Sequence, residues 1–157
     1  MTTPSQAGSP AVRPKEFHFP ASVEWVGERR VVAGVEGKPA IAVMPPPVFR
    51  GTDPATWSPE DLLVAAVASC LAVTFTGLAA RGGLEYENLR VDADGVVGRR
   101  PDGRFGFTSL ELWFAVSVAA GAETAARDLA AEAERTCLVS ASLDVPVEAQ
   151  VVVTTST

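Results

Sequence analysis

The chain has 157 residues, 47% of them hydrophobic, which is enough to build the core of one domain. Its formal net charge is −6 and its basic residues are scattered, so it lacks the concentrated positive charge of proteins that bind nucleic acids or anionic membranes. The composition leaves small molecules and other proteins as partners.

Residues 1–15 are rich in Pro, Ser and Thr and predict a disordered tail, followed by a single domain over residues 16–157. The beginning of the chain lacks the basic and apolar segments of a secretory signal, so we expect a cytoplasmic protein. In that compartment a permanent disulfide is rare. The longest apolar run, residues 62–71, is shorter than the roughly 20 residues of a membrane span, so we expect no membrane partner.

Between residues 17 and 44, short β-branched and apolar runs alternate with glycines, which predicts a meander of strands with His18 in the first of them. The proline-rich segment 44–57 then predicts a loop rather than a helix or a strand.

The segment "SPEDLLVAAVASC", residues 58–70, predicts a long helix. Ser58 is the expected N-cap, Pro59 occupies the first helical position, and Asp61 completes a capping box. The pair Gly82-Gly83 marks the end of the helix. Because apolar residues occur on every face, we expect the helix to be buried on more than one side.

Residues 83–98 predict a strand with a turn at Asp94-Gly95, and strict alternation over residues 107–118 predicts a long, half-buried strand. An amphipathic helix over residues 122–137 and a strand over residues 145–154 follow. This order predicts an α+β fold with helices packed on a mostly antiparallel sheet.

The chemistry of the chain rests on its two cysteines. The single histidine and the lack of C-x-x-C or H-x-x-x-H spacing predict no metal site, and the lack of glycine-rich phosphate motifs predicts no nucleotide cofactor. Cys70 and Cys137 are either buried packing residues or reactive thiols. A reactive thiol at Cys70 needs a nearby cation, for which Arg29, Arg30 and Arg50 are the candidates.

Four segments, "SPEDLLVAAVASC", "RGGLEYENLRVDADG", "GFTSLELWFAVSV" and "AERTCLVSASLDVPVEAQVVV", resemble the OsmC/Ohr family from about residue 20 onward. The resemblance implies an OsmC-like fold, in which mostly antiparallel sheets wrap around long central helices in an intertwined homodimer. It also implies a thiol-dependent peroxidase that reduces organic hydroperoxides, with a dithiol such as a dihydrolipoyl group of a lipoylated protein as reductant.

Carried over by position, the resemblance makes Cys70 the peroxidatic thiolate, Cys137 the resolving thiol, and Glu60 the partner of a catalytic arginine, either Arg29 or Arg30. Glu28 stands where the family's hydroperoxide reductases prefer a Gly-Gly-Arg run, and Leu138 stands where the family often has proline. These departures leave the arginine and the substrate open. The alternative is an OsmC-like ligand-binding or stress-associated protein without peroxidase turnover.

Glu60 and Cys70 are separated by ten residues of one helix, about 15 Å along its axis. One guanidinium cannot easily contact both within a chain, so we expect the partner subunit to contribute to each site. The flanking apolar residues are candidates for either core or pocket, and a pocket built from them favours bulky alkyl hydroperoxides. These residues are Phe49, Trp57, Leu71, Phe75 and Leu138.

Overall fold

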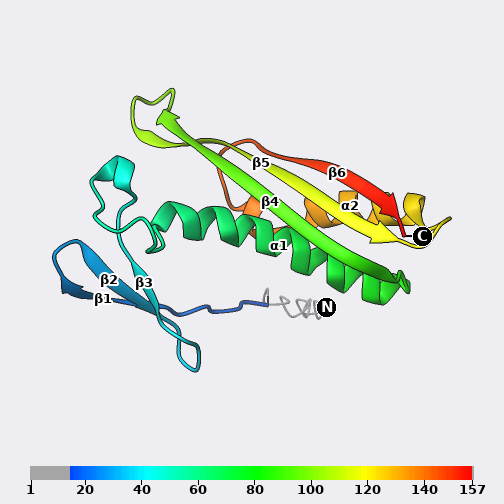
Figure 1. Cartoon of the computed structure of the whole chain (residues 1–157), viewed down its shortest axis with the longest axis horizontal. Coiled ribbons are helices and arrows are strands. Elements are labelled where there is room, and N and C mark those ends of the chain that lie inside the picture. The colour runs from blue at the N-terminus through cyan, green and yellow to red at the C-terminus, as the bar shows by residue number, and fades with distance from the viewer. Residues whose placement is uncertain (1–14, 157) are drawn as a thin grey trace, which may run out of the picture.

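The computed structural model describes residues 15–156, which form two three-stranded sheets and a set of helices (Figure 1). The tail predicted over residues 1–15 lies outside the described residues apart from Lys15. In chain order the elements are β1 Ser22–Gly27, β2 Arg30–Gly34, β3 Ile41–Val43, η1 Pro47–Phe49, α1 Pro59–Gly82, β4 Tyr86–Arg99, β5 Phe105–Val118, α2 Glu123–Thr136, α3 Leu138–Ala141 and β6 Val147–Thr155.

The N-terminal sheet is the predicted meander, with antiparallel β1, β2 and β3 in sequence order. His18 is not in a strand, contrary to expectation, because β1 begins only after Pro20, which has no N–H to donate to a ladder. The sheet projects away from the second sheet and is covered by no helix of the described chain (Figure 1). Its Trp25 is accordingly 69% exposed.

The boundaries of α1 agree with the sequence prediction. Ser58 Oγ accepts a hydrogen bond from the N–H of Asp61 at 3.0 Å, and the Asp61 carboxylate accepts one from the N–H of Ser58 at 2.8 Å. Gly83 ends the helix in the left-handed conformation, with φ of 68°. The preceding segment is a loop as predicted, except for the single turn η1, which begins at Pro47 where a missing N–H is tolerated.

Only one face of α1 is buried within the chain, whereas the sequence predicts burial on more than one side. The opposite face includes Val73, which is 69% exposed. The helix has 24 residues, more than the apolar run within it. Its length and hydropathy alone would allow it to cross a membrane. Core helices pass the same test, and here the inner face packs beneath a sheet. That inner face consists of Val67, Leu71, Phe75 and Ala79.

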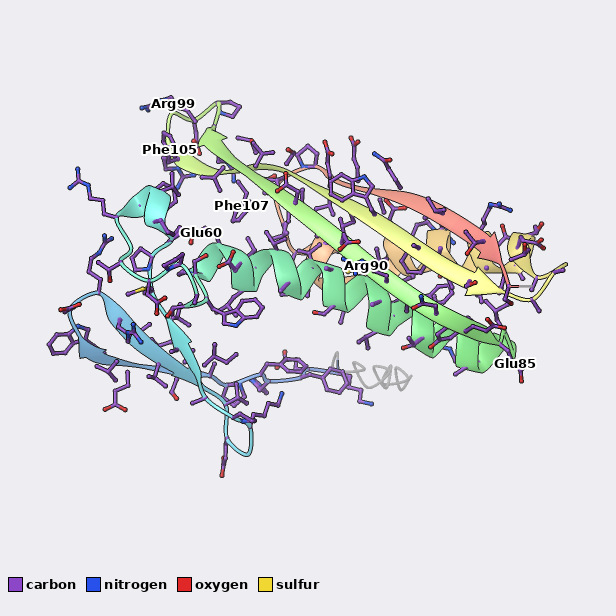
Figure 2. All side chains as sticks on the ribbon, viewed as in Figure 1. Glu60, Glu85, Arg90, Arg99, Phe105 and Phe107 are labelled. Carbon is purple, nitrogen blue, oxygen red and sulfur yellow. The ribbon has the colours of Figure 1, made fainter. Side chains whose placement is uncertain are left out.

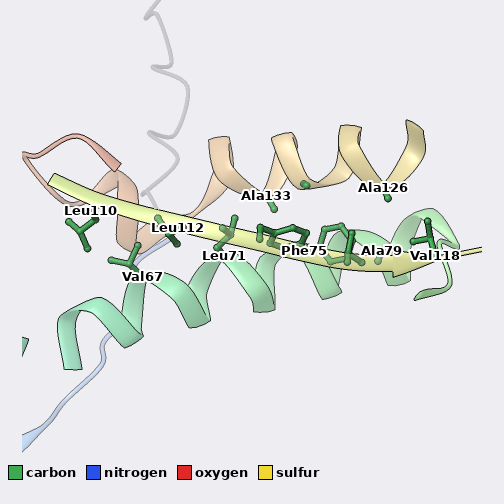
Figure 3. Close-up of a cluster of buried hydrophobic side chains, with 12 residues drawn as sticks. Val67, Leu71, Phe75, Ala79, Leu110, Leu112, Val118, Ala126 and Ala133 are labelled. Atoms are coloured by element: carbon green, nitrogen blue, oxygen red, sulfur yellow. The ribbon is translucent and has the colours of Figure 1, made fainter. Parts of the chain in front are cut away.

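The second sheet, in the order β4-β5-β6, carries the core. β4 and β5 are antiparallel, while β5 and β6 are parallel, with α2 in the crossover between them. The predicted α+β class is therefore confirmed, with a mixed second sheet. Alternate residues of β5 point onto α1 and α2 (Figure 3). These are Leu110, Leu112, Phe114, Val116 and Val118, each at most 2% exposed.

The turn predicted at Asp94-Gly95 is wrong, because β4 runs through both residues and Gly95 pairs with Leu110 of β5. The glycine has a packing role. A Cβ atom there would lie 2.6 Å from Phe107 Cε1 and 2.8 Å from Val64 Cγ2. Gly95 thus lets the Phe107 ring and α1 approach the strand closely.

We expect Gly95→Ala to lower the free energy of unfolding by about 1 to 3 kcal/mol, because the added methyl overlaps Phe107 and Val64. Chemical denaturation measures the change. Gly98→Ala on the same strand is the matched control, since its Cβ would meet Thr108 Cγ2 at an ordinary 3.6 Å. Equal stability of the two variants would contradict the packing role of Gly95.

Candidate functional site

The structure brings the two cysteines together. Cys70 lies in the middle of α1, beside the buried Leu71, and is half-buried. Cys137 lies at the junction between α2 and α3 and is only 1% exposed. Both are free thiols, α1 packs against α2 and α3, and the Cys70 side chain is close enough to interact with that of Cys137.

The backbone holds Cys137 from both sides. Its N–H donates to the carbonyl of Glu134 at 3.4 Å, and its carbonyl accepts from the N–H of Ala141 at 3.0 Å. The short helix α3, which the sequence analysis did not predict, brings Ser140 back toward the thiol. Ser140 Oγ donates a hydrogen bond to Cys137 Sγ over 3.1 Å.

These contacts shift the ionisation of Cys137. Burial of the thiol raises its pKa, but hydrogen bonds from the hydroxyl and N–H of Ser140, from Cys70 and from the N–H of Val139 outweigh burial. The pKa of Cys137 therefore lies below its ordinary value. A thiol that ionises more easily is more available as a nucleophile near neutral pH.

Glu60 stands in the first turn of α1, on the side of the Phe105 and Phe107 end of β5 (Figure 2). Its Oε2 atom is buried and has no hydrogen-bond partner within residues 15–156. Together with Phe49, Phe105 and Phe107 it lines a cavity of about 300 Å³. An unpaired carboxylate oxygen in apolar surroundings is costly, so the position is suited to receiving a cation.

The candidate arginines Arg29 and Arg30 contact the loop before α1. Arg29 Nη1 donates to the carbonyls of Phe49, at 2.8 Å, and Arg50, at 3.4 Å, and Arg30 forms an ion pair with Asp53 at 3.4 Å. In the part of the chain that the structure describes, these contacts tie both guanidiniums to the loop before α1. None of them reaches either thiol or Glu60, so the catalytic role of an arginine stays a prediction.

A second, larger groove of about 760 Å³ runs between the start of α1 and β4. Trp57, Glu60, Ser69 and Asp94 are among its lining residues. Within residues 15–156, no three His, Cys, Asp or Glu side chains gather closely enough to hold a metal ion.

Of the five apolar residues predicted to flank the site, two line cavities: Trp57 in the larger groove and Phe49 in the smaller. Phe75 and Leu71 belong to the core, and Leu138 is 76% exposed.

Two residues that contact the candidate site residues were not predicted from the sequence. Ser140 donates a hydrogen bond to the thiol of Cys137, and Asp53 forms an ion pair with Arg30 in the loop before α1. The hydroxyl of Thr56, the N–H of Ala55 and Arg30 together hold the pKa of Asp53 below its ordinary value. The signal for Ser140 was present in the sequence as a polar residue three positions after the second cysteine.

Comparison with known proteins gives a consistent picture. The family model described as OsmC-like protein matches residues 51–151. The uncharacterized protein YmaD of Bacillus subtilis is 27% identical over 142 residues, which cover 86% of this chain and 92% of that protein.

Solved structures share the fold at lower identity. An OsmC-like protein of unknown function from Vibrio cholerae superposes with a TM-score of 0.81 at 19% identity, covering 87% of this chain and 100% of that one. An organic hydroperoxide resistance protein from Elizabethkingia anophelis gives a TM-score of 0.70 at 19% identity, covering 92% and 100%. The organic hydroperoxide resistance protein OhrB of Bacillus subtilis gives 0.61 at 17% identity, covering 87% and 98%.

The family model spans well over half of the chain, and the overall fold is shared with these solved structures. The chain belongs to the OsmC/Ohr family.

Proposed function

We propose that the protein is a thiol-dependent peroxidase that reduces organic hydroperoxides. The observation that carries the proposal is the meeting of Cys70, which is half-buried, with Cys137, which is fully buried and has a lowered pKa. A pair of free thiols far apart in the sequence but adjacent in the fold suits a two-cysteine cycle. The organic hydroperoxide resistance proteins among the structural relatives support the same substrate class.

In the first step, the Cys70 thiolate attacks the terminal oxygen of the hydroperoxide. The sulfur–oxygen bond forms as the O–O bond breaks, the alkoxide leaves and takes up a proton as the alcohol, and Cys70 becomes a sulfenic acid. In the second step, the Cys137 thiolate attacks that sulfur. A disulfide forms, and the oxygen leaves as hydroxide, which is protonated to water. An external dithiol, such as a dihydrolipoyl group, then restores both thiols by exchange.

The exposure of the two thiols supports this division of roles. Cys70 is the more accessible of the two and is the better placed to meet a substrate. Cys137 is withdrawn from solvent but has a pKa below its ordinary value, which suits a thiol whose target is another residue of the same chain.

We further propose that the protein acts as a homodimer and that Glu60 serves the Cys70 of the partner subunit, together with Arg29 or Arg30. Glu60 lies about 15 Å from Cys70 along the axis of α1, and its buried Oε2 lacks a partner in the described part of the chain. The apolar outer face of α1 and the uncovered N-terminal sheet, with Val73 and Trp25 both exposed, supply surface that a second copy would bury. An arginine beside Cys70 would stabilise both its thiolate and the leaving alkoxide.

A cytoplasmic location is part of the proposal, because the cycle needs thiols that are kept reduced. The alternative function, a ligand-binding or stress-associated protein without turnover, is favoured by one observation. The groove of about 760 Å³ beside α1 is large enough for a small molecule and is not lined by either cysteine.

The central test is the intact mass of the reduced protein after exposure to a slight excess of cumene hydroperoxide or hydrogen peroxide. We expect rapid loss of two hydrogens with the organic oxidant, and gain of one oxygen on Cys70 in Cys137→Ser, where no disulfide forms. Cys70→Ser is the control and should consume no hydroperoxide. An unchanged wild-type mass under both oxidants would contradict the proposed peroxidase activity and favour the ligand-binding function.

The ionisation of Cys137 is tested by titrating thiolate absorbance in Cys70→Ser, which retains a single thiol. We expect a midpoint below that of the same variant unfolded in guanidinium, because the hydrogen bonds from Ser140 and Val139, which this variant keeps, lower the folded-state pKa of Cys137. By linkage, this stabilises the fold fully above the unfolded-state pKa, and the stabilisation is lost as the pH falls through the folded-state pKa. A folded midpoint at or above the unfolded one would contradict the expected shift.

Shared sites between subunits are tested by co-expressing Cys70→Ser with Glu60→Gln. Each variant alone should be inactive, but a mixed dimer has one complete site if Glu60 acts across the interface. Random pairing should therefore recover roughly a quarter of the wild-type rate of hydroperoxide reduction. No recovery in a preparation shown to contain mixed dimers would place Glu60 and Cys70 of each site in the same chain.

A further inference from the structure

Ser140 uses its hydroxyl in an unusual way among the helical hydroxyls of the described chain. Serine and threonine in helices commonly donate to a backbone carbonyl three or four residues earlier. Ser69, Thr136 and Ser142 do so, donating to Ala66, Glu132 and Leu138. Ser140 donates instead to the sulfur of Cys137, three residues earlier, over 3.1 Å.

The hydroxyl supplies a constraint that the backbone alone does not. The main chain of Cys137 is held by the last turn of α2 and the first turn of α3, but these bonds leave rotation about its Cα–Cβ bond free. A hydrogen bond to Sγ selects one rotamer. Cys70 lies on α1, which packs against both α2 and α3, and it is among the groups that lower the pKa of Cys137, so the rotamer fixed by Ser140 is held beside the other cysteine.

We propose that Ser140 is a positioning residue for the resolving step, whose hydroxyl holds the sulfur of Cys137 against Cys70 and stabilises it as a thiolate. The inference rests on the proposed function, because it assigns Cys137 to attack on an oxidised Cys70. In that step the Cys137–Cys70 sulfur–sulfur bond forms and the bond from Cys70 to its leaving group breaks. The Ser140 hydrogen bond weakens as the negative charge passes from Cys137 to that leaving group.

This arrangement matters for the fate of the sulfenic acid. A sulfenic acid that is not captured by a thiol is open to further oxidation to sulfinic acid, which is not readily reversed. A sulfur that ionises more easily and is already held in one rotamer needs no rotamer search before it attacks Cys70. Ser140 therefore favours disulfide formation over over-oxidation.

The experiment measures attack by Cys137 without requiring any peroxide chemistry. Dithionitrobenzoate converts the more accessible Cys70 to a mixed disulfide and releases one thionitrobenzoate. Attack by the Cys137 thiolate on the Cys70 sulfur then closes the internal disulfide and releases a second. The rate of the second release is followed by absorbance as a function of pH in the full-length protein.

We expect Ser140→Ala to slow the second release about tenfold near neutral pH, the scale of one charge-assisted hydrogen bond, and to shift its pH profile to higher pH. Ser140→Thr, which keeps the hydroxyl, should restore both. Ser142→Ala is the matched control, since that hydroxyl donates only to the Leu138 carbonyl, and it should behave as wild type.

An unchanged rate and pH profile in Ser140→Ala would overturn the inference, as would equal slowing in Ser142→Ala, which would reveal a general loosening of α3. Absence of a second release from the wild type would overturn it too. If the second release behaves as expected but cumene hydroperoxide does not oxidise Cys70, the proposed function fails while the role of Ser140 stands.

Discussion

The inner face of α1 is packed against the second sheet, and the geometry of the site depends on this contact. Burial of each large apolar side chain in this contact stabilises the fold by on the order of 1.5 to 3 kcal/mol. The contact therefore fixes how the helix is rotated about its axis and where it lies along the sheet. Cys70 comes directly before Leu71 of that face in the sequence and is half-buried, so it lies at the margin of the core. The helix α2 approaches α1 closely because its own buried stripe is built from small side chains. These are Ala126, Ala130 and Ala133 (Figure 3).

Much of this frame follows from local sequence rules. The reciprocal hydrogen bonds of Ser58 and Asp61, the left-handed Gly83 and the alternation along β5 are each set by a few neighbouring residues, and each is confirmed. What local rules missed depends on distant contacts. Gly95 reads as a turn residue in sequence, yet it lies within β4, where the Phe107 ring from the adjacent strand occupies the space that a side chain would need.

The candidate site also has some features that the sequence predicts and others that depend on the fold. The family pattern singled out both cysteines, and the fold brings them together, but no sequence rule predicts that Ser140 gives its hydroxyl to a sulfur rather than to a carbonyl. Neither the sequence nor the described chain assigns the catalytic arginine. Arg29 and Arg30 bind groups of the loop before α1, and the buried oxygen of Glu60 has no partner in the described chain, so the described residues do not pair these charges with one another.

The long separation of the two cysteines along the chain has an energetic consequence. A disulfide between Cys70 and Cys137 would close a loop of about 67 residues that contains all of β4, β5 and α2. Closing such a loop removes conformational entropy from the unfolded chain, equivalent to about 4 kcal/mol on the polymer model. A cycle through this disulfide would therefore alternate between two covalent topologies of one fold, and the reduced form, which is ready to react, would be the one that unfolds more easily.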